Sequence, residues 1–448
     1  MTYDSLVAAL EEGLNEVPLL DAHTHLVGGH LSARGLHDLF LHHMVISDLY
    51  AAGCPSGARL SDEPTEEEAT RRLEEALPYA PLIRNTSCSW TLRVILGDLY
   101  GWHEPITAEN WRELDAVIRR RSADPAWPRE IMRRAGIHRA CTEIVRRGDG
   151  HADDLLQYAL EWAFFARAQW GVNDIPLYEL EATWGQTAPA QPLPVTLGSR
   201  PPVAREIKTT ADVREALGHY CDLIPFDQVL STAQHLSTDL DYRLISDEEM
   251  SAALQRRPQA TEADRDVYAS YLLEAFLQEL ESRDSDLVFQ FSLGAEPLPF
   301  ETASRISQRT IAQAAEIIAR HPRVQFQCFL SSRHANQSLC TMVRELPNFS
   351  VAGYWWHNFF PSIVQQIMDE RLDMLPVNKQ VGFFSDAYSL ELAYAKAQMV
   401  RKELAPVLAR RVSQGQYTQT EALEIAREIL YVTPQTLLGM VPADDLAP

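Results

Sequence analysis

The chain has 448 residues, of which 46% are hydrophobic and 23% charged, ordinary values for a globular protein. Its formal net charge of −22 argues against a nucleic-acid partner, because such a partner requires a basic surface. No apolar run approaches the roughly 18 residues that span a bilayer, and the N-terminus lacks the pattern of a signal peptide. Six scattered cysteines without CxxC spacing complete the expectation of a cytoplasmic protein without membrane contact.

Extended and helical patterns alternate along most of the chain. Residues 5–16 have the apolar spacing of an amphipathic helix, and a strand is predicted over Leu19–His25. Six later apolar runs are typical of buried parallel strands: Arg139–Glu143, Ile175–Leu180, Leu287–Leu293, Val324–Leu330, Phe349–Trp356 and Val381–Ser385. Helical patterns such as Ser304–Arg320 separate several of them. We therefore predict an α/β fold, a (β/α)8 TIM barrel forming one domain over residues 1–448.

Two stretches depart from this alternation. Residues 57–135 are mainly helical in pattern, which predicts a helical insertion after the first strand. Residues 184–205 are rich in proline and are expected to form a long surface loop, a candidate lid over the site. The helical segment from about 404 to 430 closes the chain.

His23 and His25 are the first residues that indicate chemistry. They lie two apart on a predicted strand, so both side chains point to the same face. At the end of a barrel strand they would meet at the C-terminal mouth, where barrel active sites lie. Imidazole is the commonest protein metal ligand, so the pair predicts a metal site. The alternative is a pair of buried histidines that bond backbone carbonyls.

Asp386 ends the apolar run that would form the eighth strand. Closure of a barrel brings that strand back beside the first, so this carboxylate could complete the metal site or accept a proton. The alternative is a helix N-cap, since a helical run starts at Leu390. In combination with His23 and His25, the metal-ligand interpretation is favoured.

An ordered series of motifs resembles the uronate isomerases of the amidohydrolase superfamily. It comprises Asp21-Ala22-His23-Thr24-His25-Leu26, His43, Arg84-Asn85, Cys141-Thr142-Glu143, Gln234-His235-Leu236, Gln290, Trp355-Trp356 with Asn358, and Ser385-Asp386. The resemblance implies a metal-dependent TIM barrel whose helical insertion follows the first strand. It covers most of the chain, although no single motif decides it.

Several positions differ from the family pattern. Where that pattern has an arginine two residues after the strand-eight aspartate, this chain has Tyr388, and Met44 replaces the tyrosine after the family histidine. Ser292 and Ser89 replace two further histidines. These changes remove groups that hold and isomerise a sugar acid. A bulky apolar substrate bound by Met44, Trp355, Trp356 and Phe359 is the simpler expectation from such a lining.

The chain also gains His357, where the family usually has phenylalanine. With His23, His25, Glu143, His235 and Asp386 it makes a predicted ligand set large enough for two metals. Alternatives remain for two members: a stacked structural histidine for His357, and a salt bridge to Arg139 or a nearby arginine for Glu143.

This pattern is similar to a divergent branch of the fold, the non-haem diiron monooxygenases of platensimycin and platencin biosynthesis. That resemblance implies two irons per chain, dioxygen, an external electron donor and hydroxylation of a diterpenoid carried as an acyl-CoA thioester. The six predicted ligands would hold the irons, and His43 and Tyr388 would orient oxygen or a proton.

Two other activities stay open. The first is aldose–ketose isomerisation of glucuronate or galacturonate with one divalent ion such as Zn or Mn. The second is hydrolysis by a metal-activated water. A barrel kept only as a binding module is disfavoured because the histidine pair and Asp386 occur together. The small-molecule substrate and the oligomeric state are not specified by the sequence, and a homo-oligomer is compatible with it.

Overall fold

The computed structural model describes residues 2–57, 60, 63–160, 164–166, 172–186, 202–238, 240–296, 303–304, 308–355 and 359–443. One sheet has the order β1 (Leu19–Asp21), β2 (Ile137–Glu143), β3 (Leu156–Leu160) and β4 (Val229–Thr232). A second sheet has the order β11 (Gln380–Val381), β10 (Phe349–Ala352), β9 (Phe326–Leu330), β6 (Phe289–Leu293) and β5 (Gln234–His235). Every pairing within these two sheets is parallel.

The two sheets join into one barrel. After Ala233, β5 continues the line of β4, and a parallel bridge between Ser231 and Val288 connects β4 to the start of β6. At the other junction, the Asp386 N–H donates to the His23 carbonyl at 3.0 Å, and the His25 N–H donates to the Ala387 carbonyl at 2.8 Å. The last strand segment therefore lies beside the first, and the predicted TIM-barrel fold is confirmed.

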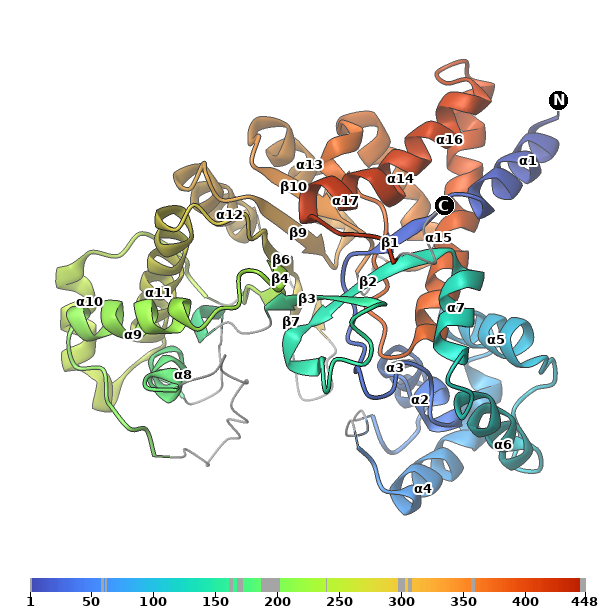
Figure 1. Cartoon of the computed structure of the whole chain (residues 1–448), viewed down its shortest axis with the longest axis horizontal. Helices are drawn as coiled ribbons and strands as arrows, with labels where there is room; N and C mark the ends of the chain where they lie inside the picture. Colours follow the sequence, from blue (N-terminus) through green and yellow to red (C-terminus); the bar gives the residue numbers. More distant parts are fainter. Residues whose placement is uncertain are drawn as a thin grey trace.

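Helices cover this barrel and extend it on two sides (Figure 1). The first group consists of α1 (Tyr3–Asn15), α2 (Leu36–Phe40), α3 (His43–Ala51), α4 (Glu66–Ala76), α5 (Ser87–Tyr100), α6 (Trp111–Ser122) and α7 (Trp127–Ala135). All but α1 fall between β1 and β2, so a helical insertion follows the first strand, as predicted.

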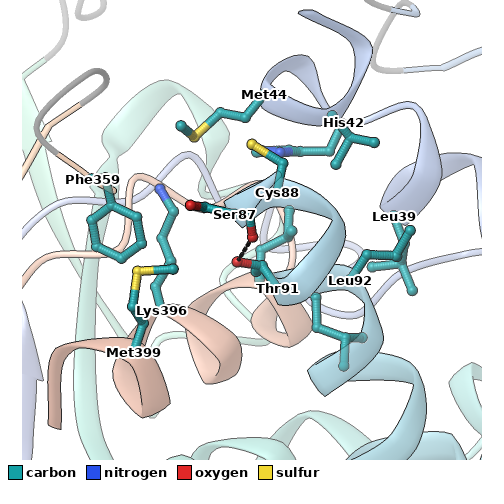
Figure 2. Close-up of a pocket in the computed structure, with 13 residues that line it drawn as sticks. Leu39, His42, Met44, Ser87, Cys88, Thr91, Leu92, Phe359, Lys396 and Met399 are labelled. Carbon is teal, nitrogen blue, oxygen red and sulfur yellow. Dashed lines mark hydrogen bonds between the residues drawn. The ribbon is translucent and has the colours of Figure 1, made fainter. Parts of the chain in front are cut away.

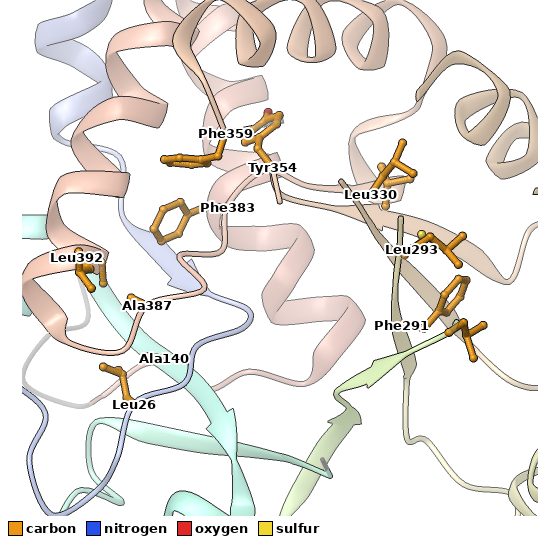
Figure 3. Packing of buried hydrophobic residues seen from close by; sticks show 14 of the residues in the cluster. Leu26, Ala140, Phe291, Leu293, Leu330, Tyr354, Phe359, Phe383, Ala387 and Leu392 are labelled. Atoms are coloured by element: carbon orange, nitrogen blue, oxygen red, sulfur yellow. The ribbon is translucent and has the colours of Figure 1, made fainter. Parts of the chain in front are cut away.

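The later helices follow the strands in turn. They are α8 (Ile175–Thr183), α9 (Thr210–Asp222), α10 (Asp247–Gln255), α11 (Glu262–Ser282), α12 (Gln308–Arg320), α13 (Asn336–Glu345), α14 (Pro361–Met374), α15 (Leu390–Ser413), α16 (Gln419–Arg427) and α17 (Thr433–Leu438). The long α15 packs against α1, α5, α7 and α14 and so ties the insertion to the barrel. Buried apolar side chains form two clusters, a large one from strands and helices (Figure 3) and a smaller one that includes Leu20, Phe329 and Phe384.

The strand prediction for Ile175–Leu180 is wrong, because this segment begins α8. All of its residues are buried, so neither a period of two nor one of 3.6 shows in the sequence. Pro176 stands in the first turn of the helix, a position that proline favours. The third strand is β3, and β4 with β5 forms the fourth, neither of which the apolar runs indicated.

Most of the proline-rich stretch, residues 187–201, lies outside the described residues, so its predicted role as a lid is untested. In the part of the chain that the structure describes, no helix is long and apolar enough to cross a membrane. The cysteines are all buried free thiols.

Candidate metal centre

His23 and His25 follow β1 at the mouth of the barrel. Between them, the Thr24 N–H and hydroxyl both donate to the Cys141 carbonyl, at 2.7 and 3.0 Å. These bonds hold the backbone against β2 while the two imidazoles share one face. Their ring centroids lie 4.9 Å apart with planes at 84°. Phe329 packs 5.0 Å from the His23 ring and closes the apolar side of the site.

Asp386 brings a carboxylate to the same pair. Its Oδ1 lies 3.2 Å from His25 Nε2 and 3.6 Å from His23 Nε2. The residue has φ of 54°, which is unusual for a side chain other than glycine and is a form of strain often found at functional sites. The N-cap of α15 is Ser389, so the alternative role of Asp386 as that cap is excluded.

Glu143 closes the group from the end of β2. Its side chain is 1% exposed; Oε1 faces His25 Nδ1 and Oε2 pairs with Arg146 Nε at 2.9 Å. His23, His25 and Glu143 each offer one ligand atom within 4.8 Å of the others. Glu143 therefore also forms the salt bridge that was the alternative interpretation, and its partner is Arg146 rather than Arg139.

The donor atoms fit a cation. His25 Nδ1 and Glu143 Oε1 are buried and face each other closely as an ion pair, and among the described residues neither atom has a further hydrogen-bond partner. Burial opposes the charge on His25, but the neighbouring Glu143 carboxylate outweighs it and raises the pKa of His25 well above its usual value. Burial likewise opposes the charge on Glu143, yet the positive His25 lowers the pKa of Glu143 to about 2. A divalent ion would replace the proton between them.

The neighbouring histidines also favour the ionised form of Asp386. Burial disfavours its charge, but hydrogen bonds from His23 and His25 hold the pKa of this carboxyl well below its usual value. Two imidazoles with two ionised carboxylates are ligands that suit zinc or manganese, and the residues therefore support a metal cofactor. Iron, the ion expected from the sequence, stays a prediction.

The other predicted ligands do not extend this group. His235 Nδ1 lies 3.0 Å from the Ser292 hydroxyl, and its ring centroid is 6.1 Å from that of Trp355. In the described ranges, it does not share a ligand group with His23 and His25. His357 and Trp356 lie outside the described residues, so the second metal has no test here.

A pocket lies next to the centre, between α3, α5, α15 and the loop before α14 (Figure 2). About 420 Å³ of space lies between these residues, a volume that includes open solvent. Met44 and Phe359, two predicted substrate contacts, both line it, together with His42 and Lys396. Trp355 is buried beside His235 instead.

Two aromatic rings connect the pocket to the metal ligands. Tyr388 stacks on His25 with centroids 4.7 Å apart, and the His42 ring stands 5.9 Å from Tyr388. The sequence analysis predicted a role for His43, whose side chain is not among those described. The structure places His42 in the pocket wall.

Comparison with known proteins finds similar solved structures. No protein-family model and no curated protein matches the sequence. Among solved structures, glucuronate isomerase from Caulobacter crescentus has a TM-score of 0.78 and 16% identity, covering 100% of this chain and 96% of the other. Uronate isomerases from Thermotoga maritima and Bacillus halodurans have TM-scores of 0.74 and 0.70, with 13% and 14% identity. These cover 97% and 99% of this chain, and 97% and 98% of their own chains.

The chain has the fold of the uronate isomerases. This finding confirms the fold that the resemblance to uronate isomerases implied, and it corrects the more specific interpretation. The assignment as a diiron monooxygenase, an oxidoreductase of diterpenoid antibiotic biosynthesis, is wrong: the whole-chain structural neighbours are isomerases. The expectations of dioxygen, an electron donor and an acyl-CoA substrate depended on that assignment.

Lys396 was missed from the sequence. It stands in the long helix α15 among apolar residues, with Leu392 four positions before it and Met399 three after it, and all three line the pocket. A lone lysine in the middle of an apolar helical face is the signal that could have found it.

Proposed function

We propose that this protein is a divalent-metal-dependent aldose–ketose isomerase that acts on a hexuronate. The observation that carries the proposal is the whole-chain likeness to glucuronate isomerase, with TM-score 0.78, combined with a buried group of two histidines and two carboxylates at the barrel mouth. Zinc or manganese is the proposed ion, bound by His23, His25, Glu143 and Asp386.

The proposed reaction is redox-neutral and requires a proton to move between adjacent carbons of the open sugar. The bound ion would supply Lewis acidity, polarising the carbonyl and hydroxyl oxygens of the sugar. Tyr388 and His42 stand between the metal ligands and the pocket, so they are the groups positioned to hold or pass that proton. Burial by Phe359 and Met44 limits water at the reacting carbons.

The test is a turnover assay on metal-free protein reloaded with Mn²⁺ or Zn²⁺. We expect glucuronate or galacturonate to be converted to the corresponding ketose acid without oxygen uptake, and the chelated protein to be inactive. Asp386→Asn should reduce turnover by at least about 100-fold, as expected for a residue that binds the ion or moves a proton. No ketose acid with either ion, over a range of uronates, would refute the proposal. Metal-dependent hydrolysis of a lactone in the same samples would support the hydrolytic alternative instead.

A further inference from the structure

Lys396 is a buried cation in the pocket beside the metal centre. The residue is only 5% exposed, and its side chain rises from α15. Figure 2 shows the amine pointing into the cavity, with Phe359 on one side and Ser87 on the other. Most of the remaining lining is apolar or contains sulfur: Leu39, Met44, Val45, Cys88, Leu92, Ile95, Leu392 and Met399.

No anion touches this amine within the ranges that the structure describes. Its one close partner is the Phe359 ring, with the nitrogen 4.8 Å from the ring centroid. The charges of Asp386 and Asp21 act on it only from a distance, and burial lowers the pKa of Lys396 from its usual value. Burying an ammonium group is costly unless it is paired, and no described residue supplies a contact that pairs it.

The position of the amine suits a ligand that also reaches the metal centre. His42 lines the same pocket and its ring faces Tyr388, which stacks on His25. A small molecule with a negative group at Lys396 would therefore have His42 and Tyr388 along its length. Arg146, the cation on the other side of the site, is already paired with Glu143 at 2.9 Å.

We propose that Lys396 binds the carboxylate of the substrate and thereby selects sugar acids over neutral sugars. The inference rests on the proposed isomerase function for the nature of the substrate. It also accounts for the composition of the pocket, because α15 supplies one buried cation to a lining that is otherwise mostly apolar. Sugar acids bearing one carboxylate are the ligand class, because the pocket holds a single buried ammonium among its described lining residues.

The test compares Lys396→Met with Lys402→Met, the same substitution on the same helix. Lys402 is exposed and lies over Trp90 at 5.4 Å, away from the pocket lining. Methionine is unbranched, only one heavy atom shorter than lysine, and suits the apolar wall, so Lys396→Met should fold. We expect it to raise KM for galacturonate about 10- to 100-fold, the loss of one charge-assisted hydrogen bond, with a smaller change in kcat. Metal content should match that of wild type, and Lys402→Met should behave as wild type.

Calorimetric binding separates this inference from the proposed function. Wild-type protein should bind galacturonate at least about 10-fold more tightly than galactose, and Lys396→Met should lose that preference while Lys396→Arg retains it. Equal binding of the acid and the neutral sugar by wild type, or an unchanged preference in Lys396→Met, would overturn the inference. Loss of the preference in Lys396→Met without any wild-type turnover would refute the isomerase proposal and uphold the carboxylate site. If Lys396→Met fails to fold, equal binding of the acid and the neutral sugar by wild-type protein would still overturn the inference.

Discussion

Substitution of Glu143 by glutamine distinguishes a metal ligand from a salt-bridge partner. The carboxylate touches both His25 and Arg146, so each role predicts a loss of stability. In the metal-free protein, lowering of the Glu143 pKa from 4.5 to about 2 corresponds to a stabilisation on the order of 3 kcal/mol. The sign follows from the direction of the shift: this contribution is present above pH 4.5 and is lost as the pH falls toward 2.

The additional stabilisation by bound metal shows whether Glu143 is a metal ligand. At an ion concentration of about 1,000 Kd, wild-type protein should gain about 4 kcal/mol in its free energy of unfolding. If Glu143→Gln weakens binding about 100-fold, the gain at the same concentration should fall to about 1.4 kcal/mol. The assay is urea unfolding with Zn²⁺ and with chelator, and the quantity compared is the difference between the two free energies.

Arg146→Gln provides the matched control. It breaks the 2.9 Å pair with Glu143 but leaves the carboxylate in place, so the metal-free protein should lose stability and the gain from metal should remain near 4 kcal/mol. If Glu143→Gln keeps the full gain from metal, Glu143 is only an ion-pair partner, and the donor set reduces to His23, His25 and Asp386.

Three further predictions concern other parts of the molecule. Tyr100→Phe removes the 2.6 Å hydrogen bond to the fully buried Glu391 carboxylate and should cost about 1.5–3 kcal/mol in urea unfolding, as expected for a bond to a charged group. Gly353→Ala places a Cβ 2.2 Å from the Phe384 ring at φ of 43°, so it should destabilise by about 1–3 kcal/mol or more and shift the thermal midpoint downward. The raised pKa of His25 means that metal uptake at pH 7 should release about one proton, and calorimetry in buffers of different ionisation enthalpy measures this number.

Each of these results has a contrary outcome. Tyr3→Phe removes a bond to the Pro406 carbonyl on the exposed surface and should change stability by less than about 0.5 kcal/mol, so an equal loss in both tyrosine variants would refute the burial argument. An unchanged midpoint for Gly353→Ala would show that Phe384 can move aside. Metal uptake without proton release would mean that His25 is already neutral in the metal-free protein.

Sequence patterns predicted more of the candidate metal centre than of the pocket. The spacing of His23 and His25 and the acid that ends strand eight were sufficient, because strand period and barrel closure together determine where those side chains go. The apolar run at Ile175–Leu180 led to a wrong strand prediction, because complete burial removes the periodicity that distinguishes a helix from a strand. Lys396 escaped notice because its neighbours in the pocket come from α3 and α5, whose positions relative to α15 depend on tertiary packing.

The closing contact between the first and last strands has a consequence for biosynthesis. Asp21 accepts a hydrogen bond from the Ser385 N–H at 2.8 Å, and the two residues are 364 positions apart in the sequence. His23 and His25 therefore leave the ribosome long before Asp386 does. At a synthesis rate of about 5–20 residues per second, the nascent chain carries its two histidines for about 20–70 seconds without the aspartate. The complete set of candidate ligands can therefore assemble only after Asp386 has been synthesised, so binding of the proposed ion by all four residues would follow folding of the barrel and not nucleate it.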